Sequence, residues 1–161
     1  MLDLHKQKEW LQMDNIQIIQ MNNNDIDEAI SLEESHNIHI LSKSILENDL
    51  KEKNNYYLVA KSNNMILGYI GISYVLDTAD IISIVVSHDY TRKGIASLLL
   101  NSIYEFCKEN NISRIMLEVR ETNTVAQNLY LKHGFTKISE RKNYYEGKEN
   151  AYIMEKKIPI I

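Results

Sequence analysis

The sequence is poor in cysteine, proline and glycine, with one, one and five of them among its 161 residues. The single cysteine, Cys107, excludes a disulfide framework and a cysteine-based metal site. No run of about 18 apolar residues occurs, which excludes a transmembrane helix, and the mixed charges of residues 1–15 are not those of a secretory signal. These absences favour a cytoplasmic protein that has neither a membrane nor a metal among its partners.

The rest of the composition is that of an ordinary globular protein, with 44% apolar and 25% charged residues. The formal net charge of −4 argues against non-specific binding to nucleic acid, so no direct nucleic-acid partner is expected. The length suggests one domain with a substantial core. We expect residues 1–14 to form an N-terminal extension whose order the sequence leaves open, and residues 15–161 to form a single domain. The sequence does not specify the oligomeric state.

Hydrophobic periodicity and turn residues predict a succession of short strands and helices. Strands are predicted around residues 16–18 and at 56–61, 65–74, 80–86, 114–120, 135–141 and 151–157. Helices are predicted at 25–36, from Ser42 or Ser44 to about Lys51, at 91–110 and at 123–133. Asp25 and Glu28 have the spacing of a capping box at the first helix, and Gly134 stands where a helix-ending glycine belongs. The order β-α-α-β-β-β-α-β-α-β-β predicts an α/β sandwich with a mixed sheet.

The first chemical signal lies at the start of the helix predicted at residues 91–110. A helix N-terminus has unpaired N–H groups and a partial positive charge, which together bind phosphate. Gly94 and Ala96 are small enough for oxygens to approach the backbone, while Arg92 and Lys93 add positive charge. An ordinary helix start with one glycine would show the same local pattern, which matches neither a dinucleotide fingerprint nor a Walker loop.

In context, these residues resemble the GNAT superfamily of N-acetyltransferases. In that family a strand, a loop and the pattern Gln/Arg-x-x-Gly-x-Gly/Ala bind the pyrophosphate of acetyl-CoA; Gly94 and Ala96 match, and Thr91 stands where Gln or Arg is usual. The resemblance implies the GNAT fold, a mixed and mostly antiparallel sheet of about seven strands flanked by about four helices. It also implies that acetyl-CoA is the acetyl donor. The residues that would bind it are Ile84, Val85, Val86, Arg92, Lys93, Gly94, Ile95, Ala96 and Ser97.

The second half is similar to one branch of that superfamily, the ribosomal-protein-alanine N-acetyltransferases of the RimI type. The similar stretches are residues 117–123, Ala126, Leu129-Tyr130, Gly134-Phe135, residues 141–145 and residues 151–154. The resemblance implies direct acetyl transfer, in an ordered ternary complex, to the α-amine of a protein N-terminus. The implied acceptor is the N-terminal alanine of a small-subunit ribosomal protein.

Attack of an amine on a thioester needs a base for the amine and an acid for the departing thiolate. Glu118 is the candidate base; it ends an apolar strand, where burial would make it a better base. Tyr130 is the candidate acid. In the RimI type the residues matching these two have these roles, and the one matching Asn123 contacts the cofactor. The transferring carbonyl also needs an N–H donor, for which Val85 and Val86 are the candidates.

Each of these residues has an ordinary structural alternative. A glutamate at a strand end is often only solvated, a tyrosine on an amphipathic helix packs, and Asn123 can cap its helix. By resemblance, Tyr144 and Tyr145 line the acceptor groove, although aromatic cross-strand packing would also account for them. RimI-type chains usually carry a Pro-Trp pair beside this groove, and residues 37–42 have neither.

Two other functions remain open. One is a GNAT enzyme that acetylates a small-molecule amine or a lysine side chain. The other is a catalytically inactive module that binds acyl-CoA as a sensor, against which the presence of both Glu118 and Tyr130 speaks. His36 and His88 are interpreted as surface residues, and Cys107 as a small hydrophobe.

Overall fold

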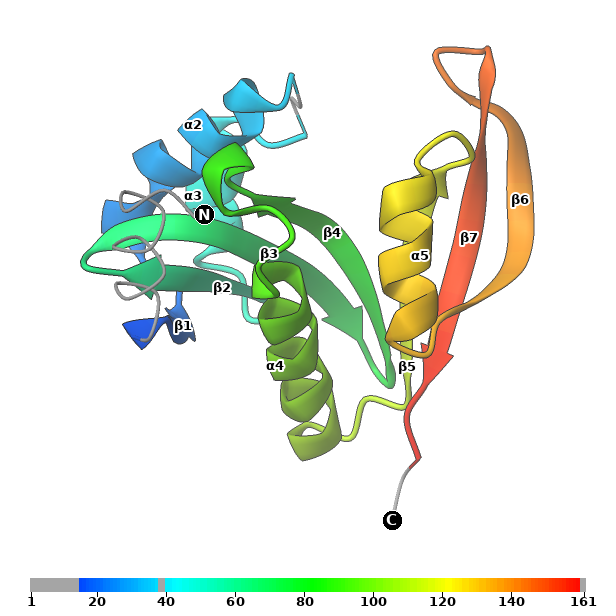
Figure 1. Ribbon diagram of the computed structural model, residues 1–161. Helices are drawn as coiled ribbons and strands as arrows, with labels where there is room; N and C mark the ends of the chain where they lie inside the picture. Colours follow the sequence, from blue (N-terminus) through cyan, green and yellow to red (C-terminus); the bar gives the residue numbers. More distant parts are fainter. Residues whose placement is uncertain (1–14, 38–39, 160–161) are drawn as a thin grey trace, which may run out of the picture.

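The computed structural model describes residues 15–37 and 40–159, which form one sheet with helices on both faces (Figure 1). The expected extension at residues 1–14 lies outside the described residues. The elements in chain order are β1 (Gln17–Gln20), α2 (Ile26–Ser35), α3 (Lys43–Asp49), β2 (Asn55–Ser62), β3 (Met65–Val75), β4 (Thr78–Val86), α4 (Ile95–Glu109), β5 (Arg114–Arg120), α5 (Thr124–Lys132), β6 (Thr136–Tyr145) and β7 (Glu149–Lys157). This order is the predicted one.

The sheet has seven strands in the order β1-β2-β3-β4-β5-β7-β6. All neighbouring strands are antiparallel except β4 and β5, which are parallel. The prediction of a mixed, mostly antiparallel sheet of about seven strands is therefore confirmed. The β4–β5 pairing covers only Thr78–Asp80 on β4, and beyond it the two strands diverge (Figure 1).

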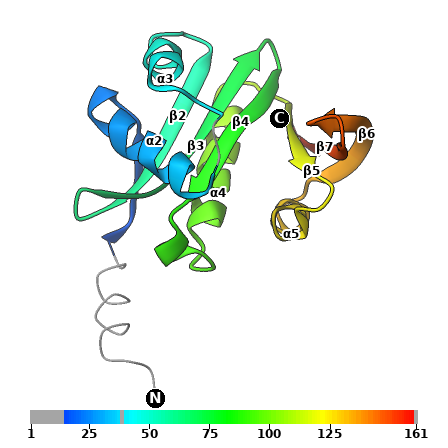
Figure 2. The ribbon, with the colours of Figure 1, turned by 90° about the horizontal axis from the view of Figure 1, so that it is seen from above.

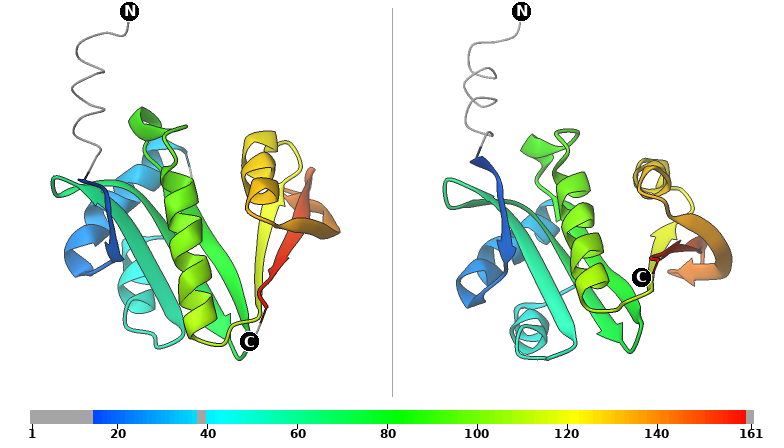
Figure 3. Two further views of the ribbon diagram at one scale, coloured as in Figure 1. Left: turned by 60° about the horizontal axis from the view of Figure 1, so that its bottom comes forward. Right: turned by 90° about the horizontal axis from the view of Figure 1, so that it is seen from below.

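Helices α2 and α3 cover one face of the sheet, and α4 and α5 cover the other (Figures 2 and 3). Each face has its own apolar cluster. Helix α4 buries Ile95, Leu99, Leu100, Ile103 and Cys107 in the larger cluster. Cys107 is completely buried, and burial raises the pKa of its thiol to about 12, so it packs as a small hydrophobe, as expected. Within the described ranges, no helix combines the length and the apolar character that crossing a membrane requires.

One predicted helix start and one predicted capping box are wrong. Helix α4 begins at Ile95 rather than at Thr91, because Arg92 (φ 61°) and Gly94 (φ 80°) adopt left-handed backbone conformations that a right-handed helix excludes. The capping box also lies one turn earlier than expected. Asn22 and Asp25 form it around a short 3-10 helix, so Asp25 makes no side-chain cap to α2.

The last hairpin is longer than predicted. Strand β6 extends to Tyr145, so both aromatic residues expected beside a loop belong to the strand itself. The turn is consequently short, with left-handed conformations at Glu146 and Gly147. The hairpin of β6 and β7 projects from the sheet next to α5 (Figure 1).

Candidate active site

The segment before α4 forms an anion-binding backbone. Gly94 is the N-cap of the helix, and the first helical hydrogen bond runs from the Leu98 N–H to the Gly94 carbonyl at 3.0 Å. The N–H groups of Ile95, Ala96 and Ser97 therefore precede the intrahelical bonds of α4. A side chain added at Gly94 would meet no heavy atom within 4 Å, so the space above the backbone is open to a ligand. Left-handed residues alternating with other conformations are typical of phosphate-binding loops.

The neighbouring strand β4 has a free edge. Its pairing with β5 stops at Asp80, whereas its pairing with β3 continues to Val86. In the described part of the chain, residues 81–86 therefore have no strand partner on the side of β5. Such an edge can accept an extended ligand through backbone hydrogen bonds, as though the ligand were an added strand. The predicted residues Ile84, Val85 and Val86 all lie on this edge.

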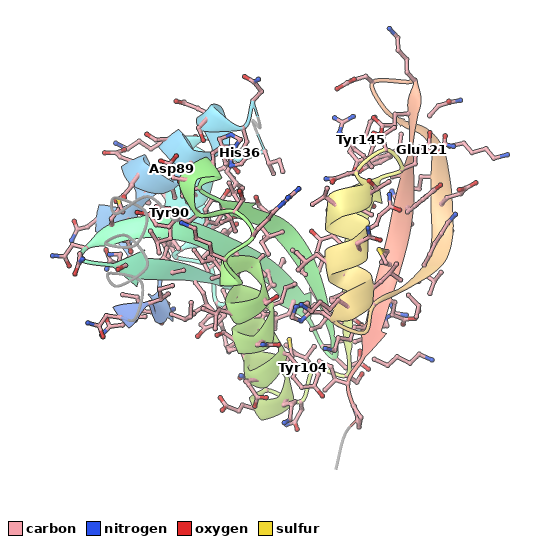
Figure 4. The ribbon with its side chains drawn as sticks, viewed as in Figure 1. His36, Asp89, Tyr90, Tyr104, Glu121 and Tyr145 are labelled. Carbon is pink, nitrogen blue, oxygen red and sulfur yellow. The ribbon has the colours of Figure 1, made fainter. Side chains whose placement is uncertain are left out.

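Two histidines connect the end of α2 to the end of β4. The sequence analysis interprets both as surface residues. The rings of His36 and His88 stack with centroids 3.7 Å apart. Nε2 of His36 lies 2.6 Å from the Val86 carbonyl oxygen, and Nε2 of His88 lies 3.0 Å from the carbonyl oxygen of Ser35. Figure 4 shows His36 at the same end of the sheet as Tyr145, on the opposite side of the diverging strands. The contacts hold the free edge of β4 in a defined position.

A hollow of about 470 Å3, here called the central pocket, lies where β4 and β5 diverge. Its lining comes from the segment before α3, from β4, β5 and β7, and from the end of β6. The residues are Ile40, Asp80, Ile81, Ile82, Met116, Leu117, Glu118, Arg141, Tyr144, Tyr145 and Ile153. The pocket thus brings together Glu118, Tyr144 and Tyr145, three residues that the sequence analysis selects from two separate strands.

Glu118 is more exposed than expected. Its side chain is 32% exposed and forms an ion pair with Arg141, with Nη2 and Oε1 3.4 Å apart. The expectation of burial at the strand end is wrong because β4 has already diverged from β5 at this level. The Glu118 carboxylate is the main cause of the raised pKa of Tyr144. The pair of Tyr144 and Arg141 therefore covers the carboxylate from the β6 side.

Tyr130 is buried on α5, with 6% of its surface exposed. Its ring meets Phe135 edge-on at 5.8 Å between centroids. Burial, with a smaller effect of Tyr145, raises the pKa of Tyr130 to about 12. The hydroxyl forms no hydrogen bond with any residue in the described part of the chain. Glu118 contributes to the raised pKa of Tyr145, and Tyr145 contributes to the raised pKa of Tyr130. Tyr145 is therefore near enough to both side chains to interact with them electrostatically.

Ion pairs of Arg120 hold the β6–β7 hairpin against β5. Its guanidinium lies 3.0 Å from Glu149 and 3.2 Å from Glu146, and its Cζ lies 4.1 Å from the centre of the Tyr145 ring. Hydrogen bonds from Thr122 and from Arg120 lower the pKa of Glu149. Glu149 is therefore engaged in holding the hairpin and does not line the central pocket.

Asn123 is the N-cap of α5. Its Oδ1 accepts a hydrogen bond from the Ala126 N–H at 3.1 Å. The capping alternative stated for this residue is thus confirmed. Capping uses only the side-chain oxygen, so a cofactor contact through the amide nitrogen is compatible with it.

Two charged residues of the central pocket are missing from the sequence prediction. Arg141 pairs with Glu118, and Asp80 lies on β4 opposite Met116. Burial, together with Glu118, raises the pKa of Asp80, and Arg114 opposes that shift. Since alternate strand residues share a face, Asp80 and Glu118 face the same side of the sheet. Only the β4–β5 register reveals this, and the sequence carried no direct signal of it.

An open strand edge, an anion-binding helix start, a pocket that contains a carboxylate and a buried phenol on α5 are the features of an acetyl-CoA-dependent N-acetyltransferase. The chain belongs to the acetyltransferase (GNAT) family, whose sequence profile matches residues 19–135.

Similarities to individual proteins support this assignment. A [ribosomal protein bS18]-alanine N-acetyltransferase of Haemophilus influenzae is 35% identical over 136 residues, which cover 81% of this chain and 90% of that protein. An N-alpha-acetyltransferase of Saccharolobus solfataricus is 36% identical over 118 residues, 65% of this chain and 71% of that protein. The crystal structure of the ribosomal-protein-S18-alanine N-acetyltransferase from Escherichia coli superimposes with a TM-score of 0.84 at 26% identity, covering 91% of this chain and 96% of that one.

Proposed function

We propose that this chain transfers the acetyl group of acetyl-CoA to the α-amino group of a protein N-terminus, and that its acceptor is the N-terminal alanine of a ribosomal protein of the bS18 type. The observation that carries the proposal is the central pocket, which places Glu118, Tyr144 and Tyr145 beside the free edge of β4. The activities named for the similar proteins of Haemophilus influenzae and Escherichia coli support the choice of acceptor. We propose that the enzyme acts in the cytoplasm, where ribosomal proteins are made.

The donor would bind along two of the elements described above. The free edge of β4 at residues 84–86 suits the amide groups of the pantetheine arm, which can pair with it as an added strand. The N–H groups at the start of α4, with Arg92 and Lys93, suit the pyrophosphate. Asn123 would contact the pantetheine arm from the side that does not face β4. An N–H of Val85 or Val86 would stabilise the charge that develops on the thioester oxygen.

Glu118 and Tyr130 would supply the two proton transfers. Glu118 accepts a proton from the amine, directly or through one water, as the new N–C bond forms. The C–S bond then breaks, and Tyr130 donates its proton to the departing thiolate. Because burial raises the pKa of Tyr130 to about 12, its phenol remains protonated at neutral pH and is available as the donor. The products are the acetylated N-terminus and coenzyme A.

The charges of the central pocket suit a cationic acceptor. Asp80 and Glu118 contribute two carboxylates, and Arg141 contributes one guanidinium, which is paired with Glu118. An α-amine, with a pKa of about 7.7–8.0, loses its proton far more easily than a lysine side chain at about 10.4. The partly exposed carboxylate of Glu118 therefore fits an α-amine better than a lysine acceptor.

A pair of peptides tests this proposal. A peptide that begins Ala-Arg should release thiol from acetyl-CoA in the presence of the enzyme, whereas the same peptide with a blocked N-terminus should release at least about 100-fold less, since it lacks the nucleophile. Thiol release is followed with a chromogenic disulfide. Equal rates with the two peptides would contradict the α-amine acceptor. Binding of acetyl-CoA without turnover on any amine would favour a sensor.

A further inference from the structure

Helix α2 carries a buried carboxylate that the proposed mechanism does not use. Glu33 is 1% exposed and lies among the apolar residues that α2 and α3 pack against β2 and β3. A carboxylate in such a place is costly unless hydrogen bonds compensate for the lost water. The contacts of Glu33 therefore show what the group holds in place.

Both carboxylate oxygens of Glu33 accept a hydrogen bond. The Tyr69 hydroxyl donates to Oε1 at 2.5 Å, and the Leu41 N–H donates to Oε2 at 3.1 Å. The Tyr69 hydroxyl also lies 3.1 Å from the hydroxyl of Ser83 on β4. Burial and the hydrogen bond to Glu33 raise the pKa of Tyr69. Glu33 thus joins α2 to the segment before α3 on one side and to β3 and β4 on the other.

Both ends of this chain of hydrogen bonds adjoin the central pocket. The Leu41 N–H belongs to the peptide bond that follows Ile40, and Ile40 lines the pocket with 52% of its surface exposed. Ser83 follows Ile82, which lines the pocket from β4. Since a hydrogen bond to an amide fixes the plane of its peptide bond, Glu33 directly orients the residue that faces the acceptor. Leu41 itself is buried in the smaller apolar cluster.

We infer that Glu33 is a positioning residue for the acceptor: it holds the peptide bond between Ile40 and Leu41 and thereby sets the wall of the central pocket opposite the β6–β7 hairpin. The inference rests on the proposed function, in which this pocket receives the N-terminus of the acceptor. Glu33 bonds directly to the Leu41 N–H but reaches β4, and so the donor edge at residues 84–86, through Tyr69 and Ser83; a change at Glu33 is therefore expected to affect the acceptor more than the donor.

The variant Glu33→Gln tests the inference with a minimal change. An amide has one accepting oxygen in place of two, so at least one of the two bonds that Tyr69 and Leu41 donate to the carboxylate is lost or reversed. We expect the KM of the acceptor peptide to rise about tenfold, with kcat and the KM of acetyl-CoA changed less than about threefold. Tyr69→Phe, which retains the ring, should shift the acceptor KM in the same direction and serves if Glu33→Gln folds poorly.

Asp25→Asn is the matched control. Asp25 is a buried carboxylate near the other end of α2, 3% exposed and 2.5 Å from the ammonium of Lys61. The Asp25→Asn variant should have a lower thermal midpoint Tm than the wild-type enzyme, and its KM for the acceptor peptide should be unchanged. If wild-type enzyme turns over the peptide but Glu33→Gln and Tyr69→Phe lower only Tm, or raise both KM values equally, the inference is overturned. If wild-type enzyme acetylates no peptide, the proposed function fails instead, and the inference fails with it.

Discussion

Replacing Tyr130 with phenylalanine is expected to lower kcat by about 10²–10⁴-fold while the Kd for acetyl-CoA stays within about twofold. The ring would remain packed against Phe135, so the substitution removes one hydroxyl and little else. Without that hydroxyl the thiolate must leave unprotonated, and the cost falls on the transition state rather than on donor binding. The free thiol released per second and a titration of acetyl-CoA measure the two quantities separately.

Tyr104→Phe is the control for this substitution. Tyr104 lies on α4 at the other end of the molecule from Tyr145 (Figure 4), and its ring contacts the ammonium of Lys156. Loss of its hydroxyl should leave kcat unchanged. An unchanged kcat in Tyr130→Phe would remove Tyr130 from the mechanism. A loss of acetyl-CoA affinity that matches the loss of kcat would assign the residue to binding instead.

Replacing Glu118 with glutamine should have a comparable effect, a fall in kcat/KM for the acceptor of about 10²–10³-fold at pH 7. At this pH most α-amines are protonated, since their pKa is about 7.7–8.0, so the reaction depends on a group that removes the proton. As the pH rises above that pKa, the amine becomes neutral without help. The deficit of the variant should therefore shrink between about pH 7 and pH 9.

Rates of the variant and of the wild-type enzyme across this pH range provide the measurement. Glu140→Gln is a suitable control, because Glu140 is an exposed carboxylate on β6 that pairs with Lys137 outside the central pocket. Its profile should coincide with that of the wild-type enzyme. A Glu118→Gln deficit that stays constant with pH would point to a role in binding the acceptor. No deficit at all would exclude Glu118 as the base.

Much of the fold could be predicted from local patterns. The strand at residues 114–120 has the predicted bounds, because an apolar alternation is framed by polar residues on both sides. Gly134 follows α5 in the expected left-handed conformation (φ 88°). These features depend on neighbours in the sequence, and a single sequence contains that information.

The features that sequence reasoning missed depend on contacts between distant residues or on rare conformations. Arg92 adopts a positive φ although it is not glycine, and so α4 starts later than its composition suggests. The exposure of Glu118 follows from the divergence of β4 and β5, and its partner Arg141 comes from another strand. Glu33 gave no sign in the sequence of being a buried carboxylate. The first is a rare local conformation, and the other two follow from how distant segments are placed in space.

The central claim is that the acetyl group goes to an α-amine held in the central pocket. It is tested most directly by a peptide that has a free N-terminal alanine and an internal lysine, incubated with enzyme and acetyl-CoA and then fragmented in a mass spectrometer. We predict that the acetyl group is found on the α-nitrogen alone, because an α-amine, with a pKa of about 7.7–8.0, loses its proton far more easily than a lysine side chain at about 10.4. Acetylation of the lysine, or binding of acetyl-CoA with no transfer to either nitrogen, would contradict the claim.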